Sequence, residues 1–360
     1  MGAKRTQKLV LAALVAALHF SCGGPAPTTE TAPSHPTFRV GFCVLDFPYE
    51  KHGKPDTLTV AVWYPTAAPA EEHTYPGGIR GFVAVNAPPL QQAGPYPLFV
   101  FSHGFGGSGL SAVYLTEHLA ARGWIVAAPD HHDPVSVARI RTGPNPAFDR
   151  KKFREIVRQI VASSPRDRDR YLYRLCELKA TIDGLLGTSD FAPLIDTSKI
   201  AVGGHSFGGF TALGLCGPLP EFHDRRIRAL VLLSSGAAEY LFTDEELRAV
   251  RAPTLLVFGR RERHQRRGKH TVAELAEKLY QNLPPPKILL ELKGAGHFSF
   301  SNALTPSWTS RFLSGTEEQF AVLRKYIFAF LDVHVLGRAQ AASILARRDP
   351  LVTRLRQEPR

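Results

Sequence analysis

One stretch decides the fold of this chain: Lys199-Ile-Ala-Val-Gly-Gly-His-Ser-Phe-Gly-Gly-Phe-Thr-Ala-Leu213. A short apolar run leads into Gly204-His-Ser-Phe-Gly208 and then into residues that suit a helix. Glycine lacks the Cβ atom that would collide where a strand turns sharply into a helix. The spacing therefore predicts a strained turn that exposes the hydroxyl of Ser206. The alternative is a glycine-rich turn with an idle serine, because the chain contains 30 glycines.

Around this turn, continuous apolar runs alternate with amphipathic segments. Such runs are typical of strands buried on both faces of a parallel sheet. We expect strands over residues 97–102, 124–128, 228–233, 252–259 and 287–292, and helices over residues 110–121, 149–162, 171–186, 273–283 and 317–331. Residues 37–49 and 58–64 suit antiparallel strands that open the sheet. Residues 50–56 and 66–96 are rich in turn-forming residues, so we expect a loop and a surface excursion there.

Several motifs carry a resemblance to a known family. They are Val62-Trp-Tyr-Pro, Phe101-Ser-His-Gly, Val126-Ala-Ala-Pro-Asp-His, Gly204-His-Ser-Phe-Gly-Gly and Gly294-Ala-Gly-His. Their order resembles the platelet-activating-factor acetylhydrolase / dienelactone-hydrolase-like branch of the α/β-hydrolases, from residue 38 to about residue 335. The resemblance implies an α/β fold with a mostly parallel central sheet and helices on both faces. Residues 134–170 exceed the minimal strand–helix alternation and are a possible lid insertion, with a plain surface excursion as the alternative.

The resemblance also implies a catalytic triad in the order Ser206, Glu262, His297. His297 follows the last predicted parallel strand. Glu262 lies three residues beyond Gly259, where the second strand after the elbow helix (the predicted helix that follows Ser206) ends. His297 would remove the proton of Ser206 and return it to the leaving alcohol. Glu262 would hold the imidazole tautomer and stabilise the imidazolium.

The acid of this triad has an alternative interpretation. Glu262 lies in the arginine-rich run 260–267, where the alternative is a solvated carboxylate paired with an arginine. Eukaryotic acetylhydrolases of this branch place the acid at the end of the strand after the elbow helix, but here residues 233–236 read Leu-Ser-Ser-Gly. The site therefore depends on Glu262, with Asp244 and Glu239 as reserve acids.

The turn His103-Gly-Phe-Gly-Gly107 follows a predicted buried strand. In the family that this chain resembles, such a turn gives one backbone amide to the oxyanion hole, and the residue after the nucleophile gives the other. Those donors would be Phe105 and Phe207. The nearby Asp130-His-His-Asp133 invites a metal-site interpretation, which we reject because no second ligand cluster lies at a recognised spacing. We expect this cluster to shape the rim of the site, and no cofactor is implied.

Residues 1–22 have the features of an export signal. Lys4, Arg5 and Lys8 precede an apolar stretch over 9–20, and Cys22 is placed as in a bacterial lipoprotein signal. Lipidation of Cys22 would anchor the protein to a bacterial membrane, in the periplasm or at the outer membrane. The alternatives are ordinary secretion and a retained N-terminal anchor.

The rest of the chain divides by composition. Residues 23–36 form a tether rich in proline and threonine. We expect the hydrolase domain over 37–337 and a basic tail over 338–360. Cys43, Cys176 and Cys216 remain beyond the signal, and one disulfide is conceivable, although Cys216 follows an apolar run and suits a buried free thiol.

The formal net charge is +12, and without residues 1–21, which hold three basic residues and no acid, it is +9 (12 − 3). Nucleic acid is a poor partner, because the arginines are dispersed and no binding motif accompanies them. An anionic membrane surface or an anionic substrate fits better, and a solvated basic surface is the plain alternative.

The sequence therefore predicts an exported serine carboxylester hydrolase that acts on acyl or lipid-like esters. A phospholipid or platelet-activating-factor-type acyl hydrolase is one alternative. A polyester hydrolase is another, because Gly294-Ala-Gly-His-Phe resembles secreted polyester hydrolases and cutinases. The non-enzyme alternative is an inactive lipoprotein of the same fold that serves as a binding module.

Overall fold

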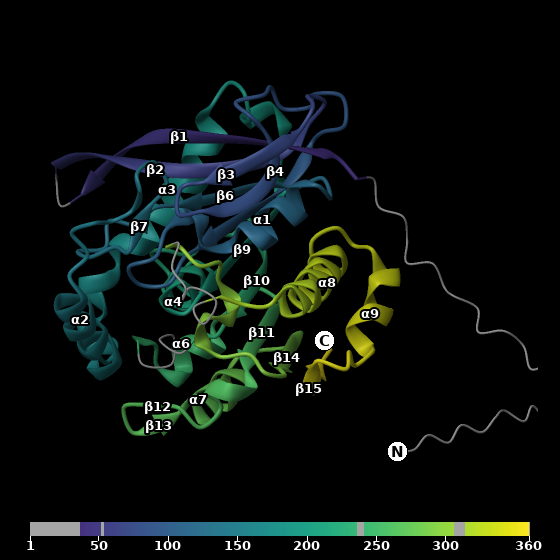
Figure 1. Cartoon of the computed structure of the whole chain (residues 1–360). Coiled ribbons are helices and arrows are strands. Elements are labelled where there is room, and N and C mark those ends of the chain that lie inside the picture. Colours follow the sequence, from purple (N-terminus) through teal and green to yellow (C-terminus); the bar gives the residue numbers. More distant parts are fainter. Residues whose placement is uncertain (1–36, 52–53, 236–240, 306–313, 360) are drawn as a thin grey trace, which may run out of the picture. The chain divides into compact units, whose positions relative to one another are not determined.

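The computed structural model describes residues 37–51, 54–235, 241–305 and 314–359 (Figure 1). The predicted signal 1–22, with Cys22, the tether 23–36 and the reserve acid Glu239 lie outside these residues. Among the described residues, no helix is both long enough and apolar enough to cross a bilayer.

The described residues build one large sheet. Its strands, in chain order, are β1 (Arg39–Lys51), β2 (Lys54–Thr66), β3 (Glu71–Tyr75), β4 (Ile79–Val85), β5 (Tyr96–Ser102), β6 (Ile125–Pro129), β9 (Ile195–His205), β10 (Ile227–Leu233), β11 (Thr254–Gly259), β14 (Lys287–Leu292) and β15 (Val352–Glu358). Their order across the sheet is β15-β14-β11-β10-β9-β5-β6-β2-β1-β4-β3. The six central strands, in sheet order β14-β11-β10-β9-β5-β6, pair in parallel, as expected from their continuous apolar runs. Figure 1 shows β1 to β4 at one end of the sheet and β14 with β15 at the other.

Helices cover both faces of the sheet. They are α1 (Val113–Ala120), α2 (Arg150–Ala162), α3 (Tyr173–Gly187), α4 (Phe207–Gly214), α6 (Asp244–Arg248), α7 (Val272–Asn282), α8 (Glu317–His334) and α9 (Ala342–Ala346). Residues of α3, α4 and α7 share one apolar core with Leu98 and Val100 of β5. Residues of α1 and α8 share the other core with Phe99 and Phe101, the alternate residues of the same strand. The parallel sheet with helices on both faces confirms the predicted α/β architecture.

Three expectations about the edges of the sheet were wrong. The predicted loop 50–56 is largely strand, because β1 and β2 continue as one antiparallel pair as far as Lys51 and Lys54. The predicted excursion 66–96 contains β3 and β4, which extend the sheet beyond β1. The predicted tail 338–360 contains α9 and then β15, which pairs antiparallel with β14 and forms the opposite edge. The sheet accordingly extends to Glu358, beyond the expected domain end at residue 337.

The segment 134–170 departs from the simple alternation, as expected. It contains the short ribbon of β7 (Ala138–Arg139) and β8 (Gly143–Pro144) and the helix α2, which Asp149 caps by accepting from the amides of Lys151 and Lys152.

In the described residues Cys43, Cys176 and Cys216 are free thiols, and Cys216 is buried.

Candidate active site

The turn between β9 and α4 holds Ser206 in a strained conformation. Its backbone lies at φ 53° and ψ −121°, a region that residues with side chains rarely adopt. A Cβ atom on Gly204 would come within 2.1 Å of the Gly208 carbonyl oxygen, and one on Gly208 within 2.0 Å of the Ser102 carbonyl oxygen. Both glycines are therefore required by the close approach of backbone to backbone, which is the reason for the spacing in the sequence.

The carboxyl ends of three neighbouring strands bring Ser234, Glu262 and His297 together. Glu262 Oε2 lies 3.4 Å from His297 Nδ1. The hydroxyl of Ser234 lies between them, 2.6 Å from Glu262 Oε2 and 2.7 Å from His297 Nδ1. The other carboxylate oxygen of Glu262 accepts from the Gly259 amide at 2.7 Å. The predicted acid and histidine are thus neighbours, connected mainly through a serine that the sequence did not single out.

Hydrogen-bond chemistry fixes the tautomer of His297. An ionised carboxylate only accepts, so the Ser234 hydroxyl must donate its hydrogen to Glu262. Its lone pair then faces His297 Nδ1, which must carry a hydrogen. The chain Nδ1–H to Ser234 to Glu262 leaves Nε2 of His297 with a free lone pair, the state that a general base requires.

Glu262 is not a solvated member of the arginine-rich run. Its side chain is fully buried. Burial by itself raises the pKa of a carboxyl, but the hydrogen bond and charge of His297, the Ser234 hydroxyl and the Gly259 amide together hold the pKa of Glu262 below its ordinary value. The neighbouring Arg263 pairs with Glu291 at 3.5 Å instead. Of the reserve acids, Asp244 begins α6 and pairs with Lys278 at 3.1 Å.

The loop after β5 carries the predicted oxyanion donor Phe105. Gly106 follows it at φ +69° and donates its amide to Asp133 Oδ2 at 2.7 Å. Farther along, the Ser108 hydroxyl and the Gly109 amide both donate to Asp130 Oδ1 at 2.9 Å. Two buried carboxylates therefore hold this loop in place. Phe207, the other predicted donor, is the first residue of α4, where helical amides point outward without a partner inside the helix.

The cluster Asp130-His-His-Asp133 follows β6 and forms hydrogen bonds with this loop. Asp133 forms a fully buried ion pair with Arg174 at 3.0 Å, and Arg174 also donates to the His103 carbonyl at 3.0 Å. Burial alone would raise the pKa of Asp133, but Arg174 lowers it below the ordinary value. His131 contacts Ser102 and Glu177 at 2.8 and 2.7 Å. Within the described residues, no group of three metal-binding side chains is found.

His205, the residue before the serine, is a buried neutral histidine. Burial lowers its pKa to about 3, and the charge of His297 contributes in the same direction. Its Nε2 lies 2.7 Å from the carbonyl oxygen of His297, to which a neutral imidazole donates a hydrogen bond. His205 therefore fixes the backbone of the loop that carries His297, a contact that the sequence pattern alone does not reveal.

A cavity of about 780 Å³ joins these elements. Ser206 and His297 line it together with Phe105 and Phe207. Helix α2, inside the predicted lid segment, forms an apolar wall with Phe153, Val157, Ile160 and Val161. In this wall the rings of Phe105 and Phe153 stack at 5.7 Å.

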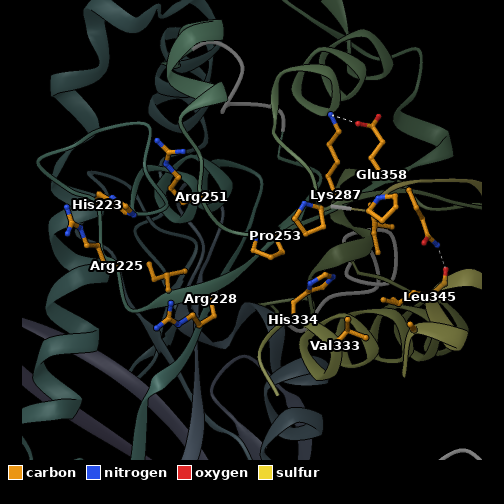
Figure 2. Close-up of a pocket in the computed structure, with 16 residues that line it drawn as sticks. His223, Arg225, Arg228, Arg251, Pro253, Lys287, Val333, His334, Leu345 and Glu358 are labelled. Atoms are coloured by element: carbon orange, nitrogen blue, oxygen red, sulfur yellow. Dashed lines mark hydrogen bonds and ion pairs between the residues drawn. The ribbon is translucent and has the colours of Figure 1, made fainter. Parts of the chain in front are cut away.

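A second cavity of about 700 Å³ lies elsewhere (Figure 2). It lies at the opposite ends of the strands, where β10 and β14 begin, and none of the predicted catalytic residues lines it. Figure 2 shows Arg225, Arg228 and Arg251 on one side of it and Lys287 with Glu358 on the other. Reactive groups of parallel sheets collect at the carboxyl ends of the strands, so the first cavity is the candidate site.

The family profile of platelet-activating factor acetylhydrolase, isoform II, matches residues 61–155 and 177–337, which is more than half of the chain. The chain belongs to this family. A relative from Cavia porcellus, described as platelet-activating factor acetylhydrolase, is 27% identical over 295 residues. That match covers 73% of this chain but only 64% of the relative. A ferulic acid esterase from Streptomyces cinnamoneus has the same fold, with a TM-score of 0.60 at 24% identity, covering 92% of this chain and 95% of that one.

One feature distinguishes this acetylhydrolase-family chain from the pattern that its sequence resembles. The strand after the elbow helix is β10, and it ends at Leu233, directly before Ser234. The position where that pattern places its acid thus carries a hydroxyl. The carboxylate near His297 belongs to Glu262, which follows the neighbouring strand β11. The Ser234 hydroxyl lies between this carboxylate and His297.

Proposed function

We propose that this protein is a carboxylic ester hydrolase that acts through an acyl-enzyme on Ser206. The observation that carries the proposal is the buried chain of hydrogen bonds from Glu262 through Ser234 to His297, which lines the same cavity as Ser206. The membership of the family and the esterase-like fold support it.

In the proposed mechanism, Nε2 of His297 takes the proton of Ser206 as the hydroxyl oxygen attacks the ester carbonyl. The carbonyl oxygen becomes negative and accepts from the backbone amides of Phe105 and Phe207. His297 then gives its proton to the leaving alcohol. Water repeats the sequence on the acyl-enzyme and releases the acid, which regenerates the Ser206 hydroxyl.

Glu262 and Ser234 would act on His297 in this cycle. Glu262 stays ionised because its pKa is lowered, so its charge stabilises the imidazolium that forms in each half of the reaction. The Ser234 hydroxyl keeps Nδ1 protonated and the ring oriented.

The four apolar side chains of α2 offer neither a charge nor a hydrogen bond to a small polar acyl group. They therefore favour a longer, apolar acyl group. This observation favours lipid-like or aromatic acyl esters over acetate. The lid function proposed for 134–170 would consist of this wall closing over the acyl group.

The test is hydrolysis of p-nitrophenyl esters of increasing acyl length by the full chain, with Ser206→Ala and the control Ser314→Ala, a second serine that lines the cavity. We expect turnover that disappears in Ser206→Ala and persists in Ser314→Ala. Highest activity on long acyl groups would favour the lipid acyl hydrolase, and activity on short soluble esters alone would favour a general esterase. Folded protein without any turnover would contradict the proposal and favour the binding module.

A further inference from the structure

We propose that the leaving alcohol of the substrate carries a net negative charge, which Arg261 and Lys293 recognise beside His297. This inference rests on the proposed ester hydrolysis and goes beyond it, because it names the chemical class of one half of the substrate. The substrate class is an amphiphilic ester with an apolar acyl group and an alcohol that bears a phosphate or a carboxylate.

The reaction itself assigns the two halves of the substrate to two sides of the cavity. The general acid must contact the leaving oxygen, so the alcohol lies on the side of His297. The acyl carbonyl lies against the amides of Phe105 and Phe207, so the acyl chain extends toward the residues next to them. These are the apolar side chains of α2, with Phe153 stacked on Phe105.

The side of His297 is basic. Arg261 precedes Glu262, and its amide donates to the Ala295 carbonyl at 2.8 Å. A Cβ atom on Gly296 would lie 4.0 Å from the Cβ of Arg261, which places that side chain beside the residue before His297. Lys293 begins the loop that carries His297, and both side chains line the cavity.

These two cations are available to a ligand. Both are exposed to solvent, and among the residues that the structure describes neither has a carboxylate partner, whereas the neighbouring Arg263 pairs with Glu291. Arg267 lines the same cavity and adds to its positive charge. Glu318 is the one exposed carboxylate among the described residues that line it. The excess of positive charge in a partly enclosed cavity favours an anion over a neutral or zwitterionic group.

The experiment compares three esters with one butyryl group and similar leaving alcohols: 1-butyrylglycerol, its 3-phosphate and its 3-phosphocholine. We expect kcat/KM for the phosphate to exceed that for the neutral ester about tenfold at low salt, with most of the difference lost at about 0.5 M NaCl. The phosphocholine ester, which has no net charge, should resemble the neutral ester.

The double variant Arg261→Gln/Lys293→Gln should lose about tenfold in kcat/KM on the phosphate and retain its activity on 1-butyrylglycerol, which also reports correct folding. The matched control is Arg225→Gln/Arg251→Gln, which removes two arginines from the other cavity (Figure 2) and should change neither activity. Equal rates on all three esters, equal rates on phosphate and phosphocholine, or the same loss in both double variants would overturn the inference. Failure of the proposed function is distinguishable, because none of the three esters would then be hydrolysed.

Discussion

At the scale of single residues, Ser234 is the unexpected member of the site. It has a positive φ of 46°, and this turn aims its hydroxyl between Glu262 and His297. Without it, the carboxylate and the imidazole would face each other at 3.4 Å, near the limit of a hydrogen bond. In the proposed mechanism Ser234 would therefore be a positioning residue that acts through His297.

Ser234→Ala should lower kcat about tenfold to a hundredfold with little change in KM, because the tautomer and orientation of His297 are no longer fixed. Steady-state kinetics on one p-nitrophenyl ester would measure both constants. The matched control is Ser235→Ala, because the neighbouring hydroxyl is buried without a hydrogen-bond partner in the described part of the chain. An effect of Glu262→Gln that simply multiplied with that of Ser234→Ala would contradict a shared chain of hydrogen bonds.

At the scale of elements, the loop after β5 depends on the buried pair of Asp133 and Arg174. Asp133 holds the Gly106 amide, one residue from the proposed donor Phe105, and Arg174 holds the carbonyl of His103 at the start of the loop. The polar cluster that followed β6 in the sequence thus serves to shape the predicted oxyanion loop.

Asp133→Asn should cost about 3–5 kcal/mol of unfolding free energy, because it leaves the charge of Arg174 buried without its partner. It should also lower kcat at temperatures where the variant remains folded, since the amide of Phe105 loses its fixed position. Urea unfolding and ester kinetics measure the two effects. Asp183→Asn is the comparison, because Asp183 is about half exposed, and should cost at most about 1 kcal/mol. A destabilised Asp133→Asn with unchanged kcat would show that the pair supports only the fold.

The elements differ in how far their sequences predict them. The buried parallel strands were predictable, because each is a continuous apolar run between turns. The edge strands β3 and β15 were not, because Glu-Glu-His-Thr-Tyr and Val-Thr-Arg-Leu-Arg-Gln-Glu read as polar segments. The charges of β15 are paired only in the fold, where Arg354 and Arg356 both contact Glu277.

The same limit applies to the site. Motif order placed Ser206, Glu262 and His297 at strand ends that the fold brings together. The bridging role of Ser234 depends on its left-handed backbone, which leaves no periodic signal in the sequence. The apolar residues of α2 do recur at helical spacing, but only tertiary packing turns that face toward the cavity.

At the scale of the whole molecule, buried and partly buried neutral histidines connect stability to pH. Burial lowers the pKa of His103 and His205 to about 3 and that of His118 to about 4, and it lowers that of His131 well below the ordinary 6.5. Below pH 6.5 the unfolded chain binds protons at these positions and the folded protein does not. Their contribution to stability is therefore complete above pH 6.5 and is lost as the pH falls toward these lower values.

The free energy of unfolding should accordingly fall between pH 6.5 and pH 5 by about 1.4 kcal/mol per pH unit for each such histidine. Asp130 and Glu177 act in the opposite direction, because burial raises the pKa of each and the folded protein then binds these protons at higher pH than the unfolded chain. Urea unfolding at several pH values measures the dependence of the free energy on pH. His118→Leu should reduce that slope by about 1.4 kcal/mol per pH unit, the contribution of one proton. A free energy that stays constant from pH 8 to pH 5 would contradict the prediction.

The most direct measurement of the central claim is the site of covalent labelling by a fluorophosphonate, read by intact mass and peptide mapping. The account predicts one adduct per chain, on Ser206, with labelling slowed at least about a hundredfold in His297→Ala. An adduct on another residue, or a folded protein that takes no label, would contradict it.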